Sequence, residues 1–256
     1  MQRYFVPENN WQSNSVSIDG EDAHHIIRVM RMQIGDEIIC NTPQGQSATC
    51  KISMIQEKEV VAEIIGWLDK SSELPVFVTI AQGLPKGDKM DLVLQKGTEL
   101  GAKAFIPFQA ERSVVKWDSR KVEKKLSRYA KIVKEASEQS HRNYLPEIKS
   151  VMNLQALIME SKRYDVKIIA YEEEAKTDTF RSFASIVKSL SKDSKVLVCI
   201  GPEGGLSMEE VNKLKEYDFI PVRLGPRILR TETAALYVLS SISYHLEELE
   251  GLSCQQ

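Results

Sequence analysis

The sequence predicts an α/β protein in which a small β-rich domain precedes a larger domain built on a parallel sheet. Short strand patterns separated by turn residues fill the first seventy residues, which is typical of a small barrel. After Pro75, continuous apolar runs alternate with helical patterns, which is typical of a parallel sheet covered by helices on both faces. A polar, proline-containing stretch separates the two patterns. We therefore expect a first domain at 1–70, a linker at 71–75 and a second domain at 76–256.

The composition narrows the class of protein. With 42% hydrophobic and 27% charged residues, the 256-residue chain is typical of a soluble globular protein. The N-terminus lacks an apolar signal segment, and no apolar stretch approaches the ~20 residues that span a bilayer. The four cysteines show neither CxxC pairing nor a histidine at zinc-ligand spacing, so we expect a cytoplasmic location and no bound metal. A net charge of −2 favours a local basic surface over a generally basic protein.

In the first domain, alternating apolar residues predict strands, and turn residues separate them. The predicted strands are Gln2–Val6, Val16–Ile18, Glu37–Cys40, Ala48–Ile55 and Glu59–Ile65. Asp19 is the expected N-cap of a short helix that ends near Met30.

In the second domain, apolar runs predict strands and 3.6-residue periodicity predicts helices. The predicted strands are Val76–Ala81, Ala104–Pro107, Val166–Ala170, Lys195–Ile200 and Phe219–Leu224. The predicted helices are Asp88–Leu100, Ser119–Glu138, Asn153–Ser161, Phe180–Leu190, one that follows Ser207 and one that begins near Thr231.

Two turns follow the last two predicted strands. Gly201-Pro202-Glu203-Gly204-Gly205 contains three glycines, which allow positive φ and close approach of a ligand to the main chain. Ser207 and Glu210 have the spacing of a capping box, so a helix begins directly after this turn. A tight strand-to-helix connection explains the turn equally well. Neither a P-loop nor GxGxxG is present, which argues against a dinucleotide-dependent dehydrogenase.

The second turn, Leu224–Arg230, shifts the balance toward a binding site. Ligands of parallel sheets bind beyond the carboxyl ends of the strands, where both turns are expected. Thr231 as N-cap with Glu232 behind it is ordinary helix-start chemistry. Arg230 is different, because a cation at a helix N-terminus opposes the macrodipole. We therefore expect Arg230 to be functional.

Basic residues gather in two further places. Lys124 and Arg128 share one face of the predicted helix Ser119–Glu138, and Arg28 and Arg31 lie close together in the first domain. Solvated side chains are the more common explanation for both. Beside an enzyme-like second domain, however, such residues favour a module that holds nucleic acid through its phosphates.

Longer stretches carry a family resemblance. GPEGGLS (201–207) and LGPRILRTETAAL (224–236) resemble the signature of the SPOUT-class methyltransferases. Four further stretches restrict the resemblance to one subfamily: MQRYFV (1–6), HHIIRVMRMQIGDEI (24–38), PKGDKMDLVLQKGTELG (85–101) and EQSHRNYLPEI (138–148). Over essentially the whole chain, the set is similar to the 16S ribosomal RNA uracil-N3 methyltransferases.

The resemblance implies a PUA-like barrel that helps to hold RNA and an α/β domain whose backbone forms a trefoil knot. It also implies S-adenosylmethionine as cofactor, held by Tyr171, Glu172, Ile200, Gly201, Pro202, Glu203, Gly204, Leu224, Gly225, Ile228, Leu229 and Thr233. A homodimer packed through the last helix is expected as well. Ala235, Val238, Leu239, Ile242 and Leu246 fit such an apolar face, although an internal core face would have the same pattern.

The implied reaction is methylation of N3 of a specific uridine in 16S ribosomal RNA, with the assembled small subunit as the expected substrate. Arg230 and Arg142 are the expected catalytic residues, while Glu203 and Glu232 are candidate bases that each also have a structural explanation. The expected RNA-binding residues are Arg3, Arg28, Arg31, Lys86, Lys89, Lys124, Arg128, Gln139 and Asn143. Two alternatives stay open: a non-catalytic RNA-binding factor, and an enzyme that acts on another base or on transfer RNA.

Overall fold

The computed structural model describes residues 1–69, 71–115, 117, 119–171 and 182–253. The chain divides into two compact units. The first unit comprises Met1–Glu73 together with Ser137–Leu145, and the second comprises Leu74–Ala136 together with Pro146–Gln256. The first unit is therefore assembled from two separate parts of the sequence.

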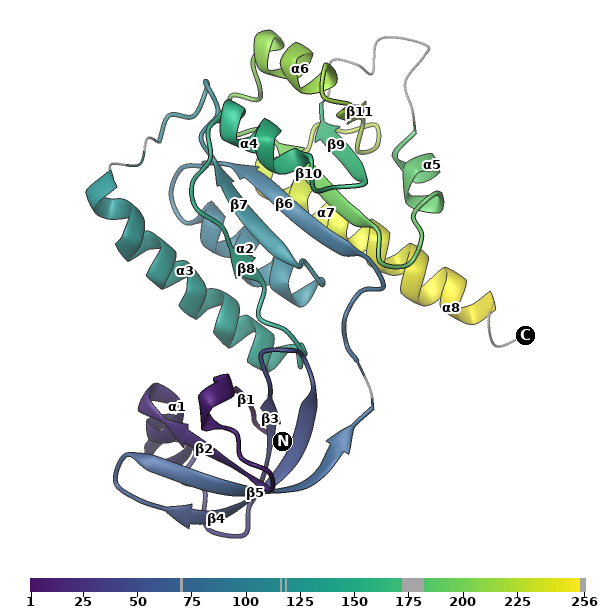
Figure 1. Ribbon diagram of the computed structural model, residues 1–256. Coiled ribbons are helices and arrows are strands. Elements are labelled where there is room, and N and C mark those ends of the chain that lie inside the picture. Colours follow the sequence, from purple (N-terminus) through teal and green to yellow (C-terminus); the bar gives the residue numbers. More distant parts are fainter. Residues whose placement is uncertain (70, 116, 118, 172–181, 254–256) are drawn as a thin grey trace. The chain divides into compact units, whose positions relative to one another are not determined.

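A five-stranded sheet with the order β1-β3-β4-β5-β2 forms the body of the first unit (Figure 1). Its strands are β1 (Arg3–Phe5), β2 (Ser15–Asp19), β3 (Glu37–Asn41), β4 (Ser47–Ile55) and β5 (Glu59–Leu68). β1 pairs with β3 in parallel, and the other neighbours are antiparallel. Alternate side chains such as Ile38, Cys40, Ala48 and Cys50 fill the core of this unit. The predicted β-rich character of this region is confirmed.

The predicted helix after Asp19 is also present. Asp19 occupies the N-cap position, but its side chain makes no capping hydrogen bond. The helix α1 (Gly20–His24) continues as a π-helical turn over His25–Val29. Ala23 and Ile26 bury their side chains in the core of the first unit.

The second unit is built on a six-stranded sheet with the order β11-β9-β10-β6-β7-β8 (Figure 1), in which all neighbouring strands are parallel. Its strands are β6 (Phe77–Gly83), β7 (Ala104–Phe108), β8 (Glu147–Ile148), β9 (Val166–Ala170), β10 (Lys195–Ile200) and β11 (Ile220–Val222). β10 lies between β9 and β6, and Ile200 pairs with both Ala170 and Gln82. Three strands therefore end at the same level.

Helices cover both faces of this sheet, as the alternating pattern predicts. They are α2 (Lys89–Glu99), α3 (Ser119–Gln139), α4 (Leu154–Ser161), α5 (Phe183–Lys188), α6 (Met208–Lys215) and α7 (Thr231–Ser243). A π-helical turn over Tyr244–Leu249 and the short helix α8 (Glu250–Ser253) continue from α7. In β10, Val196 and Val198 pack into a core shared with α2 and α7. Leu197 and Cys199 point into the opposite core, which α4 and α6 complete.

The N-termini of α6 and α7 are capped in different ways. The capping box of α6 is confirmed, because Glu210 N donates to Ser207 Oγ at 3.2 Å and Ser207 N donates to Glu210 Oε2 at 2.9 Å. The N-cap prediction for Thr231 was wrong by one residue, since Arg230 occupies the N-cap of α7. The Thr231 hydroxyl donates instead to the carbonyl oxygen of Gly201 at 2.6 Å. Residues 180–181 of the predicted helix 180–190 lie outside the described residues.

The C-terminus of α3 closes through an unusual residue. Arg142 N donates to Ser137 O at 2.9 Å, which is the long hydrogen bond of a Schellman motif. His141 then occupies the left-handed position of this motif, with φ of 58°. Glycine is the usual residue at this position, because a side chain there crowds the following carbonyl.

We predict that His141→Gly stabilises the protein by about 1 kcal/mol, since glycine adopts this backbone conformation without steric strain. His141→Ala is the matched control, because alanine removes the imidazole but keeps Cβ. The free energy of unfolding, measured by urea denaturation, should rise only for the glycine variant. Equal stabilities of the two variants would contradict the assignment of strain to His141.

Candidate functional site

The turn after β10 uses both the positive φ and the close packing that glycines allow. Gly205 has a φ of 69°, and a Cβ on Gly201 would lie 2.9 Å from the carbonyl carbon of Gly205. The turn also packs tightly against the end of β6, because a Cβ on Gly83 would lie 2.4 Å from Pro202 N. A side chain at Gly83 would therefore force the two strand ends apart, and one at Gly201 would open the turn itself.

A short hydrogen-bond chain joins this turn to α7. Gln82 Nε2, at the end of β6, donates to Thr231 Oγ1 at 2.7 Å, and Thr231 Oγ1 donates to Gly201 O at 2.6 Å. Gln82 and Thr231 are both buried. α7 begins directly after the Leu224–Arg230 turn. These two hydrogen bonds therefore fix both turns relative to β6.

The two turns line a cavity of about 650 Å³, a volume typical of small-molecule sites. A second cavity of about 80 Å³ shares Ala170, Tyr171, Ile228, Leu229 and Ala234 with the first. This shared end is mostly apolar. Lys89, Arg112, Glu203 and Arg230 place charged groups elsewhere on the wall of the larger cavity. A ligand with an apolar and a charged part fits such a lining.

Arg230 is an exposed cation on the wall of this cavity. It occupies the N-cap of α7, and its side chain forms no hydrogen bond or ion pair with any described residue. Arg112, by contrast, donates from Nη1 to Gly204 O at 3.3 Å. The guanidinium of Arg230 is thus available to a ligand.

Glu203 and Lys89 form an ion pair, with 2.8 Å between Oε1 and Nζ. The hydrogen bond to Glu203 raises the pKa of the Lys89 ammonium. Partial burial raises the pKa of the Glu203 carboxyl, but the hydrogen bonds from Lys89 and Lys86 outweigh it and hold that pKa below its usual value. Both groups therefore stay charged at neutral pH, and Glu203 is a poor proton acceptor.

Most of the predicted cofactor residues meet at this place. Those that line the larger cavity are Tyr171, Ile200, Gly201, Pro202, Glu203, Gly204, Ile228 and Leu229. Leu224 lines only the smaller cavity, Gly225 lines a separate groove, and Thr233 lines none of these. Glu172 lies outside the described residues.

The sequence did not identify Arg112, Ala170, Met208, Thr231 or Ala234 as residues of this cavity. Arg112 follows β7, which ends at the same edge of the sheet as β6. The rule that ligands bind beyond strand ends would have indicated it, had it been applied to every strand.

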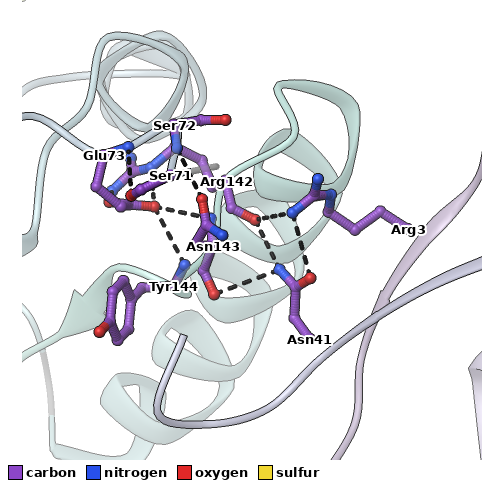
Figure 2. Close-up of polar contacts among 8 residues, drawn as sticks. All are labelled: Arg3, Asn41, Ser71, Ser72, Glu73, Arg142, Asn143 and Tyr144. Atoms are coloured by element: carbon purple, nitrogen blue, oxygen red, sulfur yellow. Dashed lines mark hydrogen bonds and ion pairs between the residues drawn. The ribbon is translucent and has the colours of Figure 1, made fainter. Parts of the chain in front are cut away.

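Arg142 lies in the first unit, in a buried polar cluster (Figure 2). Its side chain is 1% exposed and donates from Nε and Nη2 to the two carboxylate oxygens of Glu73, at 2.9 and 2.5 Å. Glu73 Oε1 also accepts from the amides of Asn143 and Tyr144, at 2.8 and 3.1 Å. These contacts support a structural role, while a catalytic role for Arg142 stays a prediction.

Arg3 and Asn143 belong to the same cluster (Figure 2). Arg3 Nη1 donates to Arg142 O, Asn41 Oδ1 and Ser47 Oγ, each at 3.2 Å. Asn143 Nδ2 donates to Ser47 Oγ at 2.9 Å, and its Oδ1 accepts from Ser72 N at 2.8 Å. Burial lowers the pKa of Arg3. Both side chains are therefore engaged within the unit.

The other predicted RNA-binding residues are accessible. Exposed side chains are those of Arg28, Arg31, Lys86, Lys124, Arg128 and Gln139, and Lys89 is partly exposed. Arg128 forms an ion pair with Asp91 at 2.7 Å. Among the described residues, no three metal-binding side chains come together. None of the described helices is long and apolar enough to cross a membrane.

Family models match both parts of the chain. A model described as an RNA methyltransferase domain matches residues 72–243, and one described as an RNA methyltransferase PUA domain matches residues 18–65. The chain is 50% identical to the ribosomal RNA small subunit methyltransferase E of Bacillus subtilis, over 98% of this chain and 99% of that protein. It is 34% identical to the protein of the same name in Aquifex aeolicus, over 87% and 90% of the two chains.

Solved structures give the same result. A methyltransferase of Legionella pneumophila, in complex with the bound cofactor S-adenosylmethionine, matches with a TM-score of 0.81 and 32% identity, over 94% of this chain and 96% of that one. A ribosomal RNA small subunit methyltransferase E of Neisseria gonorrhoeae, bound to S-adenosylmethionine, matches with a TM-score of 0.82 and 28% identity, over 95% and 97%. The expected fold class, a SPOUT-type α/β domain with a PUA-like β-domain, is confirmed.

The Glu73–Arg142 pair makes the stability of the protein depend on pH. Burial raises the pKa of Glu73, but hydrogen bonds from Arg142, Asn143 and Tyr144 lower it more, so the pKa lies below its usual value. The pair therefore stabilises the fold above pH ~4.3, the pKa of an unfolded glutamate, and this contribution is lost as the pH falls through the lower folded-state pKa.

We predict that Glu73→Gln costs about 3 kcal/mol at pH 7, because it leaves the Arg142 charge buried without its partner. The difference from wild type should shrink as the pH falls through the acidic range. Urea denaturation at pH 7 and at a series of pH values below ~4.3 would measure both effects. Glu63→Gln, on the exposed side of β5, is the control and should change little. A difference that stays constant with pH would contradict the role of the ionised carboxylate.

Proposed function

Because the chain belongs to the family of the ribosomal RNA small subunit methyltransferases E, we propose that it methylates N3 of one uridine in 16S ribosomal RNA. S-adenosylmethionine is its cofactor. The observation that carries the proposal is the cavity between the two turns. Arg230, which has no partner among the residues that the structure describes, lies at its wall.

The residues of the cavity suit S-adenosylmethionine. Its adenine has flat, apolar faces, and the end that Tyr171, Ile228, Leu229 and Ala234 share between the two cavities can hold such a ring. The charged methionine part needs polar partners, which the main chain of the Gly201–Gly205 turn and the charged side chains supply. When bound, the cofactor supplies a methyl group activated by its sulfonium charge.

Arg230 can stabilise the negative charge that forms on uracil during this reaction. Uracil N3 carries a proton and becomes a good nucleophile only when that proton is lost. The resulting negative charge spreads over the two flanking carbonyl oxygens, so a cation aimed at them stabilises the transition state. The guanidinium of Arg230 has no partner in the described part of the chain, and the N-terminus of α7 adds its partial positive charge at the same place. Glu232 remains a candidate for accepting the proton, since the hydrogen bonds that lower the pKa of Glu203 make Glu203 a weak base.

We propose that Gln139 contacts the target nucleotide and that Arg142 acts indirectly. Gln139 is exposed at the end of α3, whereas the Arg142 side chain is fully buried on Glu73. Arg142 would then fix the backbone of the segment that bears Gln139 and His141.

RNA contact is proposed for exposed basic residues. The first 73 residues contain 6 Lys and Arg but 11 Asp and Glu, so the attraction of this unit for phosphate must be local. Arg28, Arg31, Lys86, Lys124 and Arg128 are the exposed candidates. N3 lies on the Watson–Crick edge, so the target uridine must be unpaired or flipped. We propose the assembled small subunit in the cytoplasm as the substrate.

A homodimer is also proposed. Ala235, Val238, Leu239 and Ile242 are buried within the second unit, so they serve its own core. Tyr237, Tyr244 and Leu249 are exposed and line a groove of about 560 Å³ beside α7, which supports a second copy docking there.

We predict that analytical ultracentrifugation gives a dimer and that Tyr244→Glu gives a monomer, because a charge would be buried in the interface. Met159→Glu, which replaces an equally exposed apolar residue on α4, should stay dimeric. A monomeric wild-type protein at micromolar concentration would contradict the proposal.

The function itself is tested on small-subunit ribosomal RNA from cells with and without the gene. We predict that mass spectrometry finds one N3-methyluridine missing without the gene and restored by wild type. Arg230→Ala should restore less than about a hundredth, since the loss of one charge-stabilising group costs roughly 10²–10³ in rate. Arg163→Ala, which removes another exposed arginine, should restore it fully.

Two results would contradict this assignment. An unchanged modification profile would remove the ribosomal uridine and direct the search to transfer RNA or to a non-catalytic RNA-binding role. Near wild-type restoration by Arg230→Ala, with cofactor binding intact, would remove the role of Arg230. With purified components, weaker methylation of assembled subunits than of naked RNA would contradict the proposed substrate.

A further inference from the structure

Lys89 occupies an unfavourable position for a lysine. It is the first residue of α2, where its charge opposes the helix macrodipole. The side chain is 30% exposed and lines the larger cavity. Helix stability alone would not place a cation here, so other interactions of Lys89 must offset this cost.

Two carboxylates hold the Lys89 ammonium. Glu203 Oε1 lies 2.8 Å from Nζ, and Glu232 Oε2 lies 3.6 Å from it. The Glu232 side chain is 11% exposed, and its Oε2 has no hydrogen-bond partner among the described residues. Lys89 is therefore the charge that offsets this buried oxygen.

The two carboxylates belong to different walls of the cavity. Glu203 lies in the turn after β10, and its Oε1 also accepts from the amide of Lys86 in the loop before α2, at 3.1 Å. Glu232 lies in the first turn of α7, two residues after Arg230. Lys89 thus connects the start of α2, the glycine turn and the start of α7.

We infer that Lys89 is a positioning residue for the cofactor, which fixes the spacing between the glycine turn and the N-terminus of α7 through Glu203 and Glu232. The inference rests on the proposed function, since it takes the cavity as the site of S-adenosylmethionine. It replaces a direct contact with RNA as the role of Lys89. An ammonium group already held by two carboxylates has little net positive charge left to attract phosphate.

The charge state of the pair supports this role. Lys89 and Glu203 shift each other's pKa in the directions that keep both ionised. Without Lys89, the pKa of Glu203 would rise, because its main stabilising partner would be lost. Glu203 would then become protonated at a higher pH than in wild type, and its hold on the loop would weaken there.

Isothermal titration of S-adenosylmethionine into the purified protein, without RNA, tests the inference. We predict that Lys89→Met and Glu203→Gln each weaken binding about tenfold. The double variant should lose much less than the roughly hundredfold expected of independent changes, because both substitutions remove the shared Lys89–Glu203 interaction. Lys89→Arg should bind more tightly than Lys89→Met. Lys213→Met is the matched control, since Lys213 forms a similar ion pair with Glu216 on α6, outside the cavity.

The pH dependence of binding separates positioning from a general structural effect. Affinity of the Lys89→Met variant should fall at a higher pH than wild type as the solution is acidified. The melting temperature should fall only slightly, because the Lys89 side chain is partly exposed, although Glu232 Oε2 loses its nearest cation. If Lys89→Met lowers the melting temperature strongly, the cofactor affinity and its pH dependence can be compared with wild type in Lys89→Arg and Glu203→Gln instead.

Ile228→Asp distinguishes failure of this inference from failure of the proposed site. Ile228 is 78% exposed and lines the cavity, so an aspartate there should weaken cofactor binding without unfolding the protein. Normal binding by Lys89→Met together with weak binding by Ile228→Asp would overturn the role of Lys89 alone. Normal binding by Ile228→Asp would remove the cavity as the cofactor site. Normal cofactor binding but lost RNA methylation in Lys89→Met would assign Lys89 to the RNA and overturn the inference.

Discussion

The hydrogen-bond chain from Gln82 through Thr231 to the Gly201 carbonyl holds the cavity together. Gln82 is the penultimate residue of β6, Gly201 follows β10 and Thr231 starts α7. Three segments from distant parts of the sequence therefore meet at two short hydrogen bonds. The Gln82 and Thr231 side chains are buried, and a buried polar group without a partner is costly. The cavity therefore requires all three segments to be in register, and β10 must lie directly beside β6.

Charge is arranged around this frame so that one cation remains free. Lys89 is engaged by Glu203 and Glu232, and Arg112 contacts the Gly204 carbonyl. Arg230 alone of these three cations has no partner among the described residues. Binding a ligand to Arg230 thus breaks no existing ion pair with that part of the chain, which lowers the cost of using it.

Local signals made much of the fold predictable. The glycines of 201–205 and the Ser207–Glu210 capping box act over a few neighbouring residues. Their pattern in the sequence is therefore sufficient to predict the turn and the start of α6. The same holds for the buried strands of the parallel sheet. Thr231 was misplaced because its hydroxyl bonds to a carbonyl 30 residues away. The surroundings of Arg142 and Lys89 could not be foreseen, because their acidic partners lie 69 and 114 residues away in the sequence.

The divided first unit has a consequence for how the chain folds during synthesis. Asn41 and Glu73 find partners in Arg142, Asn143 and Tyr144, which are translated about seventy residues after the last strand of their sheet. At ~5–20 residues per second, the ribosome needs roughly 4 to 14 s to deliver that segment. During this interval the Glu73 carboxylate and the Asn41 amide lack these partners, and water must solvate them. All strands of the nascent β-sheet are therefore available before the buried polar groups have their hydrogen-bond partners. Synthesis of residues 137–145 supplies these partners and completes the first unit.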